Sequence, residues 1–165
     1  MARLFVAAWP PAEAVARFLH VERLSHPMMR WTTDDQWHIT LRFLGEADED
    51  AACDALERVH HGPAMATLGP LPKLLGRKVV VLPVQGLDSL AAEVGRVMAP
   101  VGADDDRQFA AHLTVARARR GGAPTVPDWR FEAEWLVDEI SVVRSELHPE
   151  GARYRVVRSV TLDTA

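Results

Sequence analysis

The chain has 165 residues, of which 48% are hydrophobic and 25% charged, as is usual for one compact soluble domain. Its 19 Lys and Arg against 23 Asp and Glu give a formal net charge of −4, which excludes a broad basic surface for long nucleic acid. A single cysteine, Cys53, excludes an internal disulfide and a cysteine-based zinc cluster, and no apolar run approaches the roughly 20 residues of a membrane span. We therefore expect a single cytoplasmic domain over residues 1–165, without a signal peptide.

Apolar residues recur with a period of about two in some segments and about 3.6 in others, which separates strands from helices. In chain order this predicts strand 4–9, helix 11–24, loop 26–35, strand 37–44, helix 46–59, strands 65–68 and 78–84, helix 87–101, strand 109–118, and strands 131–137, 140–147 and 154–162. The last two strands are expected to form a hairpin around residues 148–151, where proline and glycine favour a turn. Because strands and helices are mixed without strict alternation, the pattern indicates an α+β fold.

One short motif occurs twice, each time after a predicted helix and nearly half the chain apart. The two copies are His38-Ile39-Thr40-Leu41 and His112-Leu113-Thr114-Val115. None of the other five histidines has threonine or serine two residues later. The repeat suggests two lobes related by approximate internal symmetry.

Side chains alternate along a strand, so His38 and Thr40 share one face, and His112 and Thr114 share another. Two imidazoles and two hydroxyls suit metal-free cleavage of a phosphodiester, which needs a base on the attacking oxygen and an acid on the leaving oxygen. The threonines can donate hydrogen bonds to the non-bridging phosphate oxygens. Composition alone does not say which histidine is the acid.

Two other interpretations of the histidines compete with this one. They could belong to buried polar networks, although strand preference explains only the threonines. They could also bind a metal, but no His-Glu-x-x-His motif and no set of carboxylate or cysteine partners completes a coordination sphere. Serine chemistry is disfavoured because the chain has no Gly-x-Ser-x-Gly segment.

Several side chains near the motifs are secondary candidates. Arg42 shares the strand face of His38 and Thr40, so it either reaches toward phosphate or forms an exposed salt bridge. Arg117 has the opposite parity from His112, which favours a structural ion pair. The basic loop residues Arg119 and Arg120 are expected to be solvated. The remaining aromatic candidates are expected to pack in the core, and these are Phe5, Trp9 and Phe109.

The paired motifs resemble those of the two-histidine phosphoesterase superfamily, and most closely its RNA 2′,3′-cyclic phosphodiesterase branch, the LigT/ThpR family. The resemblance extends over essentially the whole chain. The further matching segments are Arg3-Leu4-Phe5, Phe43-Leu44-Gly45, Ala116-Arg117, and Ser145, Leu147, Gly151 and Tyr154. Ala111 is a departure, because the family commonly has proline before its second histidine; we expect this to alter the entry into the strand and not the chemistry.

This resemblance implies a bilobal α+β fold whose antiparallel-rich sheets line a central cleft, with helices outside. It implies opening of a 2′,3′-cyclic phosphate to a 2′-phosphomonoester, with His38 as the proton donor to the leaving 3′ oxygen and His112 as the proton acceptor that activates water. Thr40 and Thr114 would bind the substrate, with Arg42 as a further candidate from its strand face, and no metal or cofactor is expected. The expected substrates are RNA ends or small cyclic nucleotides, for a protein that acts as a monomer without a membrane or an obligate protein partner.

Two alternatives remain open on the residues alone. The same acid and base could cleave or reversibly join 2′-5′ phosphodiester linkages, in an activity like that of an RNA ligase. The cleft could instead bind nucleotides without turnover.

Overall fold

The structure is a computed structural model that describes residues 1–163. In chain order its elements are β1 (Ala2–Ala8), α1 (Ala12–Leu19), β2 (Met29–Trp31), a short 3₁₀ helix (Asp34–Gln36), β3 (Ile39–Ala47), α2 (Glu49–Leu56), β4 (Ala64–Leu68), β5 (Lys73–Leu75), β6 (Val79–Gln85), α3 (Asp88–Met98), β7 (His112–Ala118), β8 (Ala133–Val137), β9 (Glu139–His148) and β10 (Gly151–Thr161). Among the described residues, none of the helices has the length and apolarity that crossing a membrane requires.

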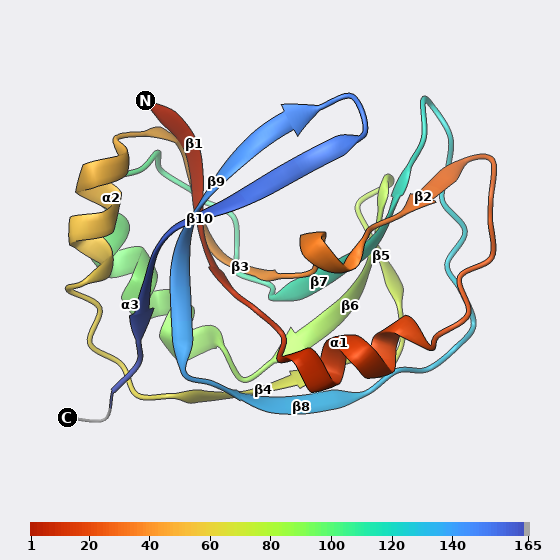
Figure 1. The fold of residues 1–165 in the computed structure, drawn as a ribbon, viewed down its shortest axis with the longest axis horizontal. Helices are drawn as coiled ribbons and strands as arrows, with labels where there is room; N and C mark the ends of the chain where they lie inside the picture. Colours follow the sequence, from red (N-terminus) through yellow and green to blue (C-terminus); the bar gives the residue numbers. More distant parts are fainter. Residues whose placement is uncertain (164–165) are drawn as a thin grey trace.

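The strands form a curled sheet in the order β10-β9-β1-β3-β7-β6-β4-β8, with β2 added beside β7 and β5 beside β6 (Figure 1). Every pairing is antiparallel. β1, α1 and β3 in one half correspond to β6, α3 and β7 in the other, so the halves meet where β3 joins β7. The predicted α+β class and the predicted internal symmetry are confirmed.

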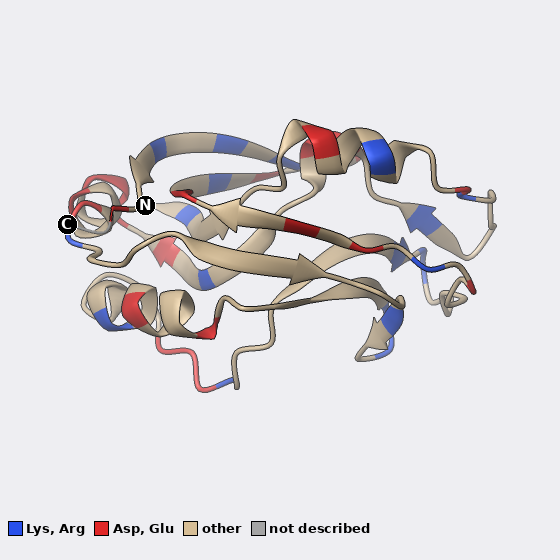
Figure 2. Ribbon diagram, turned by 90° about the horizontal axis from the view of Figure 1, so that it is seen from below, with Lys and Arg blue, Asp and Glu red and all other residues tan. Residues whose placement is uncertain are grey.

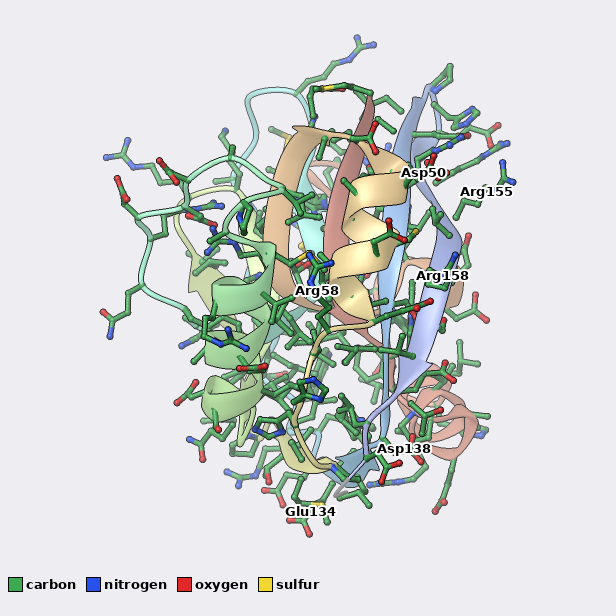
Figure 3. The ribbon with its side chains drawn as sticks, turned by 90° about the vertical axis from the view of Figure 1, so that its left-hand side faces the viewer. Asp50, Arg58, Glu134, Asp138, Arg155 and Arg158 are labelled. Atoms are coloured by element: carbon green, nitrogen blue, oxygen red, sulfur yellow. The ribbon has the colours of Figure 1, made fainter. Side chains whose placement is uncertain are left out.

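Helices α2 and α3 pack against each other outside the sheet, α2 on β9 and β10 and α3 on β3 (Figure 3). α2 begins at a true N-cap, because the Asp48 carboxylate accepts a hydrogen bond from the Ala51 backbone N–H at 2.8 Å. An ion pair between Glu57 and Arg158 joins the end of α2 to β10. The buried faces of these helices and strands form one large apolar core.

The predicted elements differ from the observed ones mainly at short edges. α1 ends at Leu19 and not at Leu24, whose side chain is 69% exposed and has no core to pack on. β7 begins at His112 and not at Phe109. β2 and β5 were not predicted, because three residues are too few for a period of two and both strands exist through pairing with longer neighbours.

Two β-bulges occupy equivalent positions in β3 and β7. In β3, Thr40 pairs with Ala7 and Arg42 with Val6, so Leu41 is an extra residue. The bulge in β7 is equivalent, because Thr114 pairs with Val81 and Ala116 with Val80, so Val115 is the extra residue. A bulge reverses the alternation of side chains beyond it, so the residue five positions after each motif histidine turns toward the same side as that histidine.

Candidate active site

The two motifs open into one cleft of about 630 Å³ on the concave side of the sheet. Its walls come from β1, β3 and β7, and the β9–β10 hairpin closes one side. All four polar motif residues line it, and these are His38, Thr40, His112 and Thr114.

The motifs face each other across the seam between the two halves. Ile39 of β3 pairs with Leu113 of β7 in antiparallel register. In such a ladder the flanking residues are also opposite, so His38 lies across from Thr114 and Thr40 lies across from His112. Both apolar centres are buried, which leaves the polar pairs on the cleft side.

His38 is held at both ring nitrogens. Nδ1 lies 2.8 Å from the carbonyl oxygen of Gln36, and because a carbonyl only accepts, Nδ1 must carry a hydrogen. The other nitrogen, Nε2, lies 3.0 Å from Oγ1 of Thr40. In the neutral ring Nε2 is therefore an acceptor, and in the charged ring it is a donor beside the threonine hydroxyl.

Three aromatic rings surround the His38 imidazole. The ring centroids of Phe5 and Tyr154 both lie 4.9 Å from it, and that of Trp9 lies 5.8 Å away. Burial among these rings lowers the pKa of His38 from 6.5 to about 4, with further lowering from the positive charges of Arg117 and His112, although its hydrogen bond to Gln36 opposes the shift. In the free protein His38 is accordingly neutral at neutral pH.

His112 is oriented in the same way as His38. Its Nδ1 lies 2.8 Å from the carbonyl oxygen of Ala110, again the residue two positions earlier. Nδ1 must therefore carry the hydrogen, and the lone pair of the neutral ring is on Nε2. Within residues 1–163, Nε2 of His112 has no hydrogen-bond partner, so it is available to a substrate or a water molecule.

Two side chains anchor the segment that supports His38. Gln36 donates from Nε2 to the carbonyl oxygen of Ala152 on β10 at 2.8 Å, and its Oε1 accepts from the Thr33 backbone N–H at 3.1 Å. Thr32 accepts from the Trp37 indole N–H at 3.0 Å and donates to the carbonyl oxygen of Thr114 at 2.8 Å. The segment that precedes the first motif is thus hydrogen-bonded to β7, the strand that carries the second motif.

The cleft is strongly basic. Its lining includes four arginines and a third histidine, His148, but no Asp or Glu. The arginines are Arg3, Arg30, Arg107 and Arg117. Figure 2 shows acidic residues instead on α2 and in the loop that follows α3. A chain with net negative charge therefore presents a local site for an anion.

The bulges determine which side chains near the motifs reach the cleft. Arg42 does not line the cleft. Its guanidinium lies beside α3 instead, where a Cβ added to Gly95 would be 3.5 Å from Nη1 of Arg42. Hydrogen bonding from Arg107 is the main cause that lowers the pKa of Asp105 to about 2, and the charge of Arg42 contributes to this shift. Phe43 takes the cleft position on β3, with the Arg107 guanidinium 5.3 Å from its ring centroid.

Arg117 departs from the expected structural ion pair. It lines the cleft and has no carboxylate partner within residues 1–163. Arg119 and Arg120 are exposed and lie outside the cleft lining, as expected for a solvated loop. Of the three aromatic residues assigned to the core, Phe109 packs on it, whereas Phe5 and Trp9 belong to a separate apolar cluster beneath His38.

Several cleft residues were missed from the sequence. Arg30 and Arg107 reach the site from a strand and a loop with no motif of their own. Arg3 and Tyr154 lie in segments that match the family, but neither was assigned to the site, and only the tertiary fold brings them to the cleft. Phe43 was missed for the same reason as Arg117, because each lies five positions after its motif histidine and beyond a bulge. The described residues contain no group of three or more His, Cys, Asp or Glu side chains arranged to hold a metal ion.

Comparisons with known proteins give consistent results. A sequence model of the 2′-5′ RNA ligase superfamily matches residues 8–149. An RNA 2′,3′-cyclic phosphodiesterase of Thermus thermophilus is 31% identical, over 97% of this chain and 90% of that protein. Among solved structures, E. coli LigT complexed with 3′-AMP superposes with a TM-score of 0.81 and 26% identity, covering 98% of each chain. The protein TT0787 of Thermus thermophilus gives a TM-score of 0.77 and 28% identity, covering 97% of each.

Proposed function

This chain belongs to the 2′-5′ RNA ligase superfamily, and from that premise we propose that it is an RNA 2′,3′-cyclic phosphodiesterase that uses His38 and His112 as its acid and base. The observation that carries the proposal is the pairing of two His-x-Thr motifs across one basic cleft, each with its histidine oriented through Nδ1. The family expected from the paired motifs is confirmed by the match over residues 8–149.

The reaction needs a proton removed on one side of phosphorus and supplied on the other. In our proposal, Nε2 of neutral His112 accepts a proton from water as the water oxygen bonds to phosphorus. The bond from phosphorus to the 3′ oxygen breaks, and Nε2–H of charged His38 protonates that leaving oxygen. The product is a 2′-phosphomonoester with a free 3′-hydroxyl, and proton exchange with solvent restores both histidines.

The threonines are placed to stabilise the charge that develops on the non-bridging oxygens. Thr40 and Thr114 lie on the cleft side of neighbouring strands, each across from the histidine of the other motif. A hydroxyl donor that is already held in position costs little reorganisation during the reaction. Arg117, on the same strand as His112, adds a fixed positive charge. We propose no such role for Arg42, which lies outside the cleft lining.

The low pKa of His38 is reconciled with an acid role by the charge of the substrate. In the free cleft, burial and nearby positive charge hold the pKa of His38 at about 4. A bound phosphodiester places a negative charge beside the ring, which favours the protonated form. Substrate binding therefore raises the pKa of His38, so that the ring is protonated when it must donate to the leaving oxygen.

We further propose that the substrates are 2′,3′-cyclic phosphate ends of RNA or small cyclic nucleotides, acted on by a monomer in the cytoplasm. The charge and shape of the cleft support this substrate class, because the cleft is basic and closed on one side by the β9–β10 hairpin. A single terminal phosphate can be held locally even though the chain carries a net charge of −4.

The test is incubation with a 2′,3′-cyclic nucleotide in excess chelator, followed by identification of the product isomer. A 2′-phosphate is expected. A 3′-phosphate would mean that the leaving group is reversed, and activity abolished by the chelator would mean that a metal is required. Tight binding without product would support a nucleotide-binding module, and turnover of only 2′-5′-linked dinucleotides would support the alternative phosphodiesterase.

A further inference from the structure

We propose that Arg30 forms a second phosphate subsite, which binds the internucleotide phosphodiester preceding the terminal nucleotide. This inference rests on the proposed function and adds to it a preference for an RNA end over a cyclic mononucleotide. Arg30 is on β2, beside the strand that carries His112, and it lines the same cleft.

Arg30 and Arg117 face each other across two paired strands. They are direct partners in the antiparallel register of β2 and β7, and both line the cleft. Like charges directly opposite each other on neighbouring strands are destabilising. In the described part of the chain no carboxylate lies within ion-pair distance of either guanidinium. An anionic ligand between or beside them would remove this repulsion.

The Arg30 guanidinium is fixed in place by the β9–β10 hairpin. Its Nη1 donates to the carbonyl oxygen of Glu150 at 2.9 Å. Gly151 packs against it so closely that an added Cβ would lie 3.0 Å from Nη2, and its φ of +122° is one that side chains rarely adopt. Within residues 1–163, the Glu150 carbonyl takes one of the five guanidinium N–H donors of Arg30, and the other donors remain to bind a ligand.

The location of Arg30 separates it from the reacting phosphate. Arg117 lies on β7 itself, with His112 and Thr114, whereas Arg30 lies one strand further, about 4.8 Å away in the pairing direction. The cyclic phosphate carries one negative charge, and the cleft contributes four arginines without a carboxylate. A second phosphate on the same ligand accounts for the additional positive charge at the β2 end.

Three substrates test this subsite. They are 2′,3′-cyclic AMP, the dinucleotide ApA with a terminal 2′,3′-cyclic phosphate, and the same dinucleotide with an uncharged methylphosphonate linkage. For the unmodified protein we expect kcat/KM for the charged dinucleotide to exceed that for the uncharged one by about tenfold, as for a charge-assisted hydrogen bond. Arg30→Gln, which removes the charge and keeps a polar side chain, should bring that ratio close to one, and its loss in kcat/KM should be larger for the charged dinucleotide than for cyclic AMP. Arg30→Lys should keep most of the preference.

Arg153→Gln is the matched control, since Arg153 is on the same hairpin but outside the cleft lining, and it should behave like the unmodified protein. A ratio that is near one in the unmodified protein, or unchanged in Arg30→Gln, would overturn the subsite. If no substrate is hydrolysed, the proposed function fails. In that case the subsite is tested by binding, with ApA that carries a terminal 3′-phosphate and with its methylphosphonate analogue. The unmodified protein should bind the charged dinucleotide more tightly than the uncharged one, and Arg30→Gln should bind the two about equally.

Discussion

Ile39 and Leu113 pair at the point where β3 joins β7, and the two His-x-Thr motifs are centred on this pair. The register makes the site symmetric, because each histidine faces the threonine of the other motif. The local symmetry extends to the hydrogen bonds, since each Nδ1 donates to the carbonyl two residues earlier. The surroundings then distinguish the two: His38 is enclosed by aromatic rings, whereas Nε2 of His112 is open to the cleft.

The bulge in β7 turns Arg117 into the cleft, and the bulge in β3 turns Arg42 out of it. We predict that Arg117→Met lowers kcat/KM on a cyclic nucleotide about 10- to 100-fold, the effect of losing a charge-assisted hydrogen bond. The same change should raise the pKa of His38, since Arg117 is one of the charges that lower it.

Arg42→Met serves as the matched control for this prediction. Its kcat/KM should stay within about twofold of the unmodified protein. Its unfolding free energy should change by no more than about 1 kcal/mol, because the buried Nε of Arg42 has no hydrogen-bond partner among residues 1–163 to lose. Equal losses of activity in Arg42→Met and Arg117→Met would contradict the assignment of the two bulges.

His38 should make stability depend on pH below neutrality. Its pKa is about 4 in the folded protein and 6.5 as the ordinary value, so the unfolded chain binds more protons between these pH values. The contribution is fully present above pH 6.5 and is lost as the pH falls toward 4, by up to about 3 kcal/mol. Urea unfolding of the unmodified protein and of His38→Gln across this window should diverge by that amount.

The same histidine should respond to anions. In an NMR titration of the His38 ring, inorganic phosphate is expected to raise the pKa, because a nearby negative charge favours the protonated form. A ring that titrates near 6.5 without phosphate, or that does not respond to phosphate, would be inconsistent with the proposed loading of the acid by its substrate.

Thr32 links the segment before β3 to β7 through one buried hydroxyl. Thr32→Val leaves the Trp37 indole N–H and the Thr114 carbonyl oxygen without that partner, so the unfolding free energy should fall by about 2 to 4 kcal/mol. Thr67→Val, at an exposed position of β4, should change it by less than about 0.5 kcal/mol. Equal unfolding curves for the two variants would show that the Thr32 bonds carry no weight.

The sequence predicted the elements with a full period well, because burial of one face leaves a direct signal in apolar spacing. β1, β3, β6 and the three α-helices were all found, and the β9–β10 hairpin was placed at the correct turn. The repeated motif also predicted the site itself. Short strands such as β2 escaped, since their existence depends on a partner and not on their own three residues.

Side-chain direction was less predictable than the elements. Strict alternation from His112 assigned Arg117 to the wrong side of β7, and strict alternation from His38 placed Arg42 on the cleft side of β3. Both errors arise because a bulge inserts one residue into a strand and nothing in the sequence marks it. Arg30 could not have been assigned either, since it reaches the cleft through pairing with β7 and a contact with a distant hairpin.

The central claim is that two histidines, one from each half of the sheet, act together on one phosphodiester. Its most direct test is the turnover of a 2′,3′-cyclic nucleotide by His38→Ala and His112→Ala, with His20→Ala at the exposed end of α1 as the control. Each motif variant should lose at least about 100-fold in kcat while the control keeps full activity, and all three should keep the circular dichroism spectrum of the folded protein. Near-normal hydrolysis by a folded His112→Ala protein would contradict the account.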